Sequence, residues 1–345
     1  MVEGTKRVVY LFGAGATQAE LDYKGIQSNQ LISEVTKRVI EKIKDDEKLK
    51  VLLRDFTTTD RIQNIEHIIS MLESIGIRKY TDIAENLRTL FKQDIENCTM
   101  IDGKTIDPFL TKALLELQEA RKMHELENLN GIITTNYDSL LDRAFNDIYK
   151  KVNYGFRHKS TVYSGEDNSN KFLVKLHGSF NWKFGMPIEV LSDLESVKEP
   201  KETIWIPPGI DKKAEIYPFN IIWGKAYDIL DCDILRVVGS SLSPNDWGLL
   251  SLIFKSQINR DYSVEIINQH HTGEHIRKNY GFIKNVKSFG NLDNCGSILS
   301  RISGEVEDTF RLENPLKFWI KENGYDLSKK YDISIYPHLS EVIGD

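Results

Sequence analysis

Apolar residues occur along the chain in two alternating patterns, short continuous runs and helical spacing. Short runs rich in β-branched and aromatic residues end in small or polar residues, which is typical of buried strands that lead into turns. These runs are Val8–Phe12, Gly131–Thr135, Phe172–Leu176, Thr203–Pro208, Ile234–Val238 and Val264–Ile267. Helical spacing predicts helices at Ser139–Tyr149, with Ser139 as a cap, and at Asp246–Ile258. Strands alternating with helices predict an α/β fold with a Rossmann-like parallel sheet.

The segment between the first two strands has apolar residues at helical spacing only. Its apolar residues fall on three helical faces. The faces are formed by Ile32, Val35, Val39 and Ile43, by Ile62, Ile65, Ile69 and Leu72, and by Ile83, Leu87 and Leu90. We therefore expect residues 1–27 and 127–280 to form the core, with residues 28–126 as a helical insertion. Residues 281–345 are expected to form a C-terminal extension that packs on this core.

Composition narrows the classes of function. The formal net charge of −6 over 345 residues argues against a bulk electrostatic grip on nucleic acid. Cys98, Cys232 and Cys295 are too few and too scattered for a disulfide framework or a four-cysteine zinc site. No apolar run approaches the ~20 residues of a membrane span, and the apolar run after the N-terminus is too short for a signal peptide. We expect a cytoplasmic protein without direct membrane or nucleic-acid contacts.

The first strand leads into the fragment Phe12-Gly-Ala-Gly-Ala-Thr17. Glycines at Gly13 and Gly15 allow a tight turn and a close approach to phosphate, and a following helix N-terminus would offer free N–H groups. The third glycine of the dehydrogenase fingerprint is replaced by Gln18, and the lysine of a P-loop is absent. The fragment is therefore either a phosphate-binding turn or a purely structural one.

Two further fragments follow predicted strands and carry reactive side chains. Asn136 and Asp138 are two residues apart, so in an extended segment they face the same way. Together they offer the hydrogen-bonding groups to hold a ribose hydroxyl, a carboxamide or a water, although an Asx turn that caps the next helix is the simpler alternative. His177 precedes Gly178 and is a candidate general base, with a half-buried structural histidine as the alternative.

Taken in order, these fragments resemble the Sir2-like (sirtuin) NAD-binding family. The matching fragments are Gly13-Ala-Gly-Ala-Thr17, Thr134-Thr-Asn-Tyr-Asp138, Leu176-His-Gly178, Val238-Gly-Ser-Ser-Leu242 and Ile266-Ile-Asn268. Asn64-Ile-Glu66, Ile206-Pro-Pro208, Trp223 and the run from Val237 to Asp246 are closer to the bacterial antiphage-defence branch than to the deacylases. The two cysteine pairs of the deacylase zinc module and the Gly-Ile-Pro-Asp-Phe-Arg loop are absent, and Thr135 stands where the family has glutamine.

The resemblance implies an NAD+ hydrolase without zinc, in which NAD is the substrate. In it, Asn136 would hold the ribose and orient water, Asp138 would bind the nicotinamide carboxamide and His177 would act as general base. The dinucleotide would further be bound by residues at four strand ends. These residues are Gly13, Ala14, Gly15, Ala16 and Thr17, then Thr135, then Gly239, Ser240 and Ser241, and then Asn268.

The same resemblance implies a biological setting. The protein would be the effector of a bacterial abortive-infection system, a homo-oligomer triggered by a separate sensor such as a HerA-type ATPase or a short Argonaute. Two other functions remain open. One is a protein deacylase or ADP-ribosyltransferase, which the missing zinc cysteines disfavour. The other is a catalytically silent NAD or ADP-ribose-binding subunit, which would have no need of both Asn136 and His177.

Overall fold

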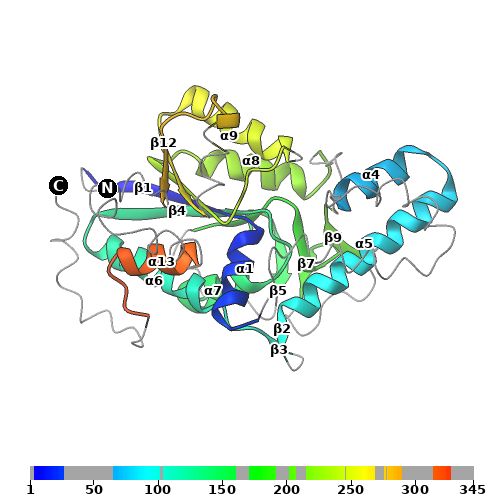
Figure 1. Ribbon diagram of the computed structural model, residues 1–345, viewed down its shortest axis with the longest axis horizontal. Helices are drawn as coiled ribbons and strands as arrows, with labels where there is room; N and C mark the ends of the chain where they lie inside the picture. The colour runs from blue at the N-terminus through cyan, green and yellow to red at the C-terminus, as the bar shows by residue number, and fades with distance from the viewer. Residues whose placement is uncertain are drawn as a thin grey trace, which may run out of the picture.

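The protein is an α/β protein built around a parallel sheet. The computed structural model describes residues 4–26, 65–101, 104–160, 171–191, 202–206, 215–244, 246–268, 276, 278–289 and 314–327. Within these residues the main sheet has six strands in the order β12-β11-β10-β1-β4-β6, and every neighbouring pair is parallel (Figure 1). Its strands are β1 (Lys6–Phe12), β4 (Glu127–Thr134), β6 (Leu173–Lys175), β10 (Ile234–Val238), β11 (Ser263–Ile267) and β12 (Val286–Phe289).

The expected α/β class and five of these strands are confirmed. Their side chains are buried on both faces, as continuous apolar runs predict for a parallel sheet covered by helices. The edge strand β12 falls within residues 281–345, for which the sequence predicts only an extension on the core. Its four residues carry too little apolar pattern to be read as a strand.

Helices cover the main sheet on both faces (Figure 1). On one face lie α1 (Ala14–Tyr23), α6 (Phe109–Met123), α7 (Leu140–Tyr149) and α13 (Pro315–Glu322), and on the other lie α8 (Phe219–Ile229) and α9 (Trp247–Asn259). Residues of α6, which the sequence places in the insertion, pack in the main core with β1 and β4. Among the helices of the described ranges, none combines the length and apolar character needed to cross a bilayer.

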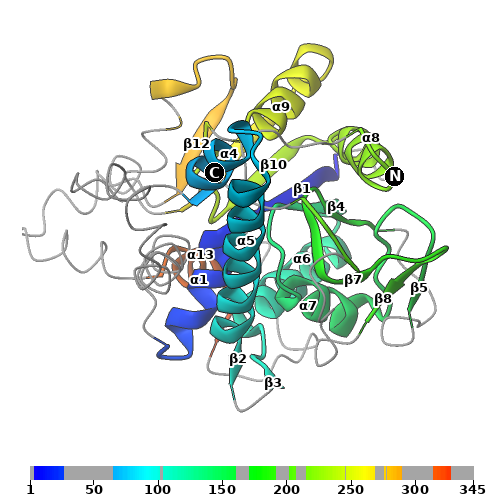
Figure 2. The same ribbon diagram turned by 90° about the vertical axis from the view of Figure 1, so that its right-hand side faces the viewer.

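Two helices form a second, smaller core beside the sheet. They are α4 (Ile65–Ser74) and α5 (Arg78–Cys98), and they project from one end of the main sheet (Figures 1 and 2). Two of the predicted helical faces, at residues 65–72 and 83–90, are confirmed, because their residues line this core together with Phe180. The predicted face at residues 32–43, Ile62 of the second face, Asn64, Pro207 and Pro208 lie outside the described residues. After α5 comes a short hairpin of β2 (Met100–Ile101) and β3 (Lys104–Thr105).

A four-stranded mixed sheet is built from strands on both sides of β6 in the chain. Its order is β5-β8-β7-β9, with β5 (His158–Ser160), β8 (Ile188–Val190), β7 (Gly178–Lys183) and β9 (Thr203–Trp205). The sequence predicts only the last of these strands. Leu176 and His177 are the two residues between β6 of the main sheet and β7 of this small sheet, so both sheets hold His177 in position.

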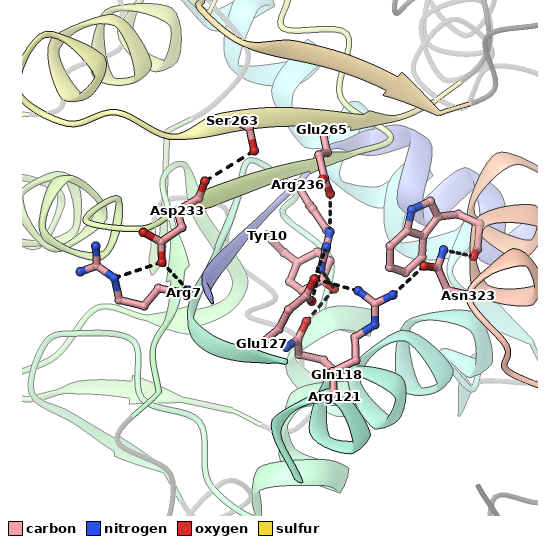
Figure 3. Close-up of polar contacts among 11 residues, drawn as sticks. Arg7, Tyr10, Gln118, Arg121, Glu127, Asp233, Arg236, Ser263, Glu265 and Asn323 are labelled. Atoms are coloured by element: carbon pink, nitrogen blue, oxygen red, sulfur yellow. Dashed lines mark hydrogen bonds and ion pairs between the residues drawn. The ribbon is translucent and has the colours of Figure 1, made fainter. Parts of the chain in front are cut away.

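A buried network of charged side chains ties the centre of the main sheet to its covering helices (Figure 3). Arg236 on β10 binds Glu127 through two nitrogen–oxygen contacts of 2.6 Å each, and binds Glu265 on β11 at 2.7 Å. Arg121 on α6 reaches the same Glu127 at 2.8 Å. Burial alone would raise the pKa of Glu127, but the two guanidinium groups lower it to about 2. Glu127 therefore stays ionised inside the protein.

The helix α13 closes this network from the C-terminal side. The Trp319 ring lies 5.6 Å from the Arg121 guanidinium and 5.2 Å from that of Arg236. Asn323 accepts a hydrogen bond from Arg121 at 2.6 Å. The start of α13 is anchored by Asn314, which caps the helix and donates to the Ala19 carbonyl oxygen of α1. The core is complete only when this late segment is in place.

A carboxylate from α1 caps the start of α6. Glu20 accepts hydrogen bonds from the Leu110 amide at 3.0 Å and from the Thr111 amide and hydroxyl at 2.6 and 2.7 Å. Burial raises the pKa of Glu20 from 4.5 to about 7, although these hydrogen bonds oppose the rise. Folding therefore favours the protonated form of this side chain.

We expect Glu20 to make the protein less stable as the pH rises. Because its pKa is higher in the folded than in the unfolded chain, its contribution is complete below pH 4.5 and is lost as the pH passes about 7. The loss amounts to about 3 kcal/mol. Urea unfolding of wild type and Glu20→Gln at pH 5 and pH 8 measures this loss. From pH 5 to pH 8 we expect the free energy of unfolding to fall more in the wild type than in Glu20→Gln. The exposed Glu85→Gln serves as control, and equal pH dependence of wild type and Glu20→Gln contradicts the assignment.

Candidate active site

The predicted site residues lie at one edge of the main sheet. Because all its strands run parallel, their carboxyl ends meet at the same edge, and each predicted fragment follows one of them. After β1 the chain adds β4 and β6 on one side, then returns to add β10, β11 and β12 on the other side, so the strand order reverses between β1 and β10. In open α/β sheets such a reversal forms a crevice outside the strand ends, where ligands bind.

The glycine turn after β1 packs against the turn after β10. A Cβ atom on Gly15 would lie 2.6 Å from the Gly239 carbonyl oxygen, and one on Gly239 would lie 2.2 Å from the Ala16 nitrogen. Gly239 also has a φ of +62°, which favours glycine. The N–H groups of Gly13, Gly15 and Ala16 donate to backbone carbonyl oxygens, two of them on the β10 side. The structural reason for these glycines is therefore close contact between two loops, and phosphate binding here stays a prediction.

Asn136 is oriented by its side-chain nitrogen. Its Nδ2 donates to the Gly13 carbonyl oxygen and to the Thr17 hydroxyl, both at 3.0 Å. Its backbone N–H is held by Thr134 Oγ1 at 3.0 Å. The Oδ1 atom makes no hydrogen bond with the described part of the chain, and the side chain is only half-buried. The carbonyl end of this amide is thus fixed in direction and able to accept a hydrogen bond from a ligand.

Asp138 lies on the same side of its segment as Asn136, because Thr17 contacts both. The Thr17 hydroxyl donates to Asp138 Oδ2 at 2.8 Å, and Asp138 Oδ1 accepts from the Leu140 amide at 3.1 Å. The second contact is the Asx turn at the start of α7, and Ser139, the predicted cap, makes no side-chain cap bond. Burial raises the pKa of Asp138, while Lys175 and Thr17 oppose the rise. Each carboxylate oxygen thus accepts one hydrogen bond, and Asp138 holds Thr17 in place, while contact with a ligand carboxamide stays a prediction.

His177 is buried beside an acidic residue from a distant part of the chain. Its side chain is 4% exposed, and its Nε2 lies 3.3 Å from Oδ2 of Asp246. The distance is that of an ion pair, but the contact lacks the alignment of a hydrogen bond, and Nε2 has no hydrogen-bond partner among the described residues. Catalytic contacts are often loose in ligand-free structures and tighten on binding. The tilted Tyr137 ring lies 6.0 Å from the imidazole.

A fully buried ion pair supports the segment that carries Asn136 and Asp138. Lys175 Nζ donates to the Asp138 carbonyl oxygen at 2.6 Å and to Asp142 Oδ2 at 2.7 Å, and both charged side chains are 0% exposed. Asp142 also accepts a hydrogen bond from Tyr154 at 2.5 Å. The lysine therefore joins β6, which leads to His177, to the loop after β4.

This geometry surrounds a stretch that resembles a known family. Residues 130–205 match the model of the SIR2-like domain. The matched stretch, called the SIR2-like segment below, runs from β4 to β9 and contains Asn136, Asp138 and His177. Among curated proteins, none matches the chain.

Similar solved structures include sirtuin complexes. One is a Sir2 homologue in complex with NAD, with 16% identity and a TM-score of 0.39, covering 89% of this chain and 91% of that chain. Another is a mutant Sir2 homologue in complex with ADP-ribose, with 15% identity and a TM-score of 0.41, covering 92% and 94%.

Within the SIR2-like segment, Gly178 has a structural reason of its own. With φ of +76°, its missing side chain makes room for β9, and close approach of a ligand here stays a prediction. A Cβ there would lie 2.4 Å from the Ile204 carbonyl oxygen. The adjacent backbone is joined by a 2.8 Å hydrogen bond from Ile206 to the His177 carbonyl oxygen. Gly178 thus fixes the small sheet against the end of β6.

The remaining predicted contacts follow β10 and β11, except Thr135, which follows β4 inside the SIR2-like segment. Asn268 donates to the Ser240 carbonyl oxygen at 3.0 Å, and the buried Ser240 hydroxyl accepts from Leu242. Ser241 is exposed, and Thr135 is half-buried with its N–H on the Phe12 carbonyl oxygen. Asn268 and Ser240 are therefore brought together, but both also stabilise the loops that carry them.

Asp246 and Lys175 are site residues that sequence patterns did not reveal. Asp246 precedes a predicted helix, where aspartate is expected as a cap, and Lys175 lies in an apolar strand. The residues next to Asp246 and Lys175 in the sequence do not indicate that either side chain contacts a distant part of the chain. The described residues contain no cluster of three or more histidine, cysteine, aspartate or glutamate side chains suited to a metal. Cys98 and Cys232 are free thiols, and Cys295 lies outside the described ranges.

Proposed function

We propose that this protein is an NAD+ glycohydrolase, which uses water to split NAD+ into nicotinamide and ADP-ribose. The observation that carries the proposal is the pairing of a fixed amide oxygen on Asn136 with a buried histidine, His177, at one edge of the sheet. The match of residues 130–205 to the SIR2-like domain supports it. The crevice at the strand-order reversal is where a dinucleotide binds in folds of this kind.

The proposed reaction breaks the bond between nicotinamide and the ribose. The electron pair of that bond leaves with the ring nitrogen, so nicotinamide departs neutral and positive charge develops on the ribose. Asn136 Oδ1 accepts a hydrogen bond from a ribose hydroxyl or the incoming water and so orients it. Water forms the new bond to the ribose carbon, and His177 takes the proton that the water loses. This proton passes to solvent when nicotinamide and ADP-ribose leave.

The other predicted residues are proposed to hold the substrate. The turn from Gly13 to Thr17 and the loop from Gly239 to Ser241 would flank the pyrophosphate, and Asn268 would lie near the adenosine ribose. Thr17 keeps Asn136 in place, and Asp138 fixes Thr17. Each oxygen of Asp138 already accepts one hydrogen bond, so we assign Asp138 a positioning role for Thr17, and its remaining lone pairs would bind the nicotinamide carboxamide.

The test is NAD+ consumption by purified wild type, Asn136→Ala and His177→Ala, with nicotinamide and ADP-ribose separated by chromatography. We expect each substitution to lower turnover at least tenfold, because each removes a group that acts on the reacting ribose or water. The exposed Asn97→Ala and His124→Ala are matched controls that retain activity. Unchanged turnover in both site variants overturns the proposal. ADP-ribose binding without turnover, even with a sensor partner, identifies a silent binding subunit instead.

We also propose a setting for the activity. The protein would act in the cytoplasm as the effector of bacterial antiphage abortive infection, where NAD+ depletion stops the infected cell. A separate sensor, such as a HerA-type ATPase or a short Argonaute, would trigger it, and it would work as a homo-oligomer. The family resemblance of the site fragments supports this extension. Affinity purification from the native host, followed by native mass measurement, tests it, and a monomer without partners contradicts it.

A further inference from the structure

The acidic neighbour of His177 is not explained by the helix it precedes. Asp246 is the N-cap of α9, a position where the carboxylate usually accepts a hydrogen bond from the first helical turn. Here its side chain makes no such cap bond. Its backbone carbonyl oxygen accepts a hydrogen bond from the Leu250 amide at 3.1 Å. The side chain is therefore directed by something other than capping.

The direction it takes is toward the imidazole. Asp246 and His177 are both buried, although they lie far apart in the sequence. Burying a carboxylate is costly unless a positive group or a hydrogen-bond donor compensates. The Nε2 atom, 3.3 Å from Oδ2, is such a donor whenever it carries a proton. The pair thus joins the end of β6 to the loop after β10, across the strand-order reversal.

We propose that Asp246 is a positioning residue that holds the proton of His177 on Nε2 and leaves Nδ1 as the nitrogen that accepts the proton from water. This inference rests on the proposed hydrolase activity. When His177 takes up a proton it becomes an imidazolium, and the carboxylate stabilises that charge without being protonated itself. A carboxylate that orients an imidazole in this way is the logic of hydrolase triads. Asp246 contacts no reacting atom in this scheme.

The first test measures kinetics. Asp246→Asn keeps the shape of the side chain but removes its charge, and we expect kcat to fall about tenfold with little change in KM. In a His177→Ala background the same substitution is expected to cost nothing more, because its effect acts through the imidazole. Asp231→Asn, which touches only a surface ion pair with Arg7, is the control. A loss of equal size in both backgrounds overturns the positioning role.

The second test does not depend on turnover. In protein labelled with ¹⁵N-histidine, NMR reports which ring nitrogen of His177 carries a proton, with His177→Gln used to assign the signals. We expect Nε2–H in the wild type and a mixture of tautomers in Asp246→Asn. Identical spectra overturn the inference. If the tautomer changes but no variant or wild type consumes NAD+, the pairing stands and the proposed hydrolase activity fails.

Discussion

Replacing Arg236 with methionine is expected to lower the free energy of unfolding by about 3–5 kcal/mol. Arg236 is 3% exposed and is the shared cation between Glu127 and Glu265. Methionine fills similar space but leaves the two carboxylates buried, with only Arg121 near one of them. Removing one partner of a buried ionic group costs much more than removing the whole group, because the remaining charge loses its compensation. Urea denaturation followed by circular dichroism measures the loss.

The comparison for Arg236→Met is Arg7→Met, which removes an arginine from the partly exposed start of β1. Its ion pairs with Asp231 and Asp233 face solvent, so we expect a change below about 1 kcal/mol. If Arg236→Met also changes the free energy of unfolding by less than about 1 kcal/mol, a structural role for the network is contradicted.

Acid unfolding of Arg236→Met gives a second readout. The pKa of Glu127 is lowered from 4.5 to about 2 on folding, so its contribution is present above pH 4.5 and is lost as the pH falls toward 2. We expect this acid-induced loss in the free energy of unfolding to be smaller in Arg236→Met than in the wild type.

Replacing Lys175 with methionine is the second large effect that we expect. The substitution leaves Asp142, which is 0% exposed, with Tyr154 as its hydrogen-bond donor but without its cation. It also removes the donor to the Asp138 carbonyl oxygen. We expect a loss of about 3–5 kcal/mol in the free energy of unfolding. The matched control is Lys183→Met on β7, whose ion pair is 40% exposed on the lysine side and should cost little.

A double variant separates the two roles of Lys175. Adding Asp142→Asn removes the unpaired charge while keeping an acceptor for Tyr154, so most of the lost stability should return. The loop that carries Asn136 and Asp138 still lacks its support. We therefore expect that NAD+ raises the melting temperature of the double variant less than that of the wild type. Full recovery of both stability and ligand response would show that Lys175 serves folding alone.

The fold was largely predictable because its strands are buried on both faces. Runs such as Ile234–Val238 have no polar interruption in the sequence except Arg236, and their order with helices indicates a parallel sheet. The small sheet was not predictable, since its strands β5 and β8 have three residues each and their pairing is set by tertiary contacts. Both α5 and α6 carry apolar residues at helical spacing, and this spacing alone does not tell which of the two packs in the main core.

The site was predictable only as a set of strand ends. Asn136 and His177 follow strands whose carboxyl ends must meet, so the sequence places them at one edge. Their partners depend on contacts over long sequence distances, such as Asp246 beside His177 and Thr17 beneath Asn136. The glycines illustrate the same limit: Gly178 and Gly239 carry positive φ angles, but what each makes room for is another backbone segment.

The late position of α13 has a consequence for synthesis on the ribosome. All six strands of the main sheet are present in the chain once residue 289 has been made, but the side chains that cover Arg121 and Arg236 come from Trp319 and Asn323. A nascent chain that ends before residue 314 carries the whole sheet with its central arginines uncovered on that side. Domains fold as units, so we expect this sheet to close over its arginines only after α13 has been synthesised.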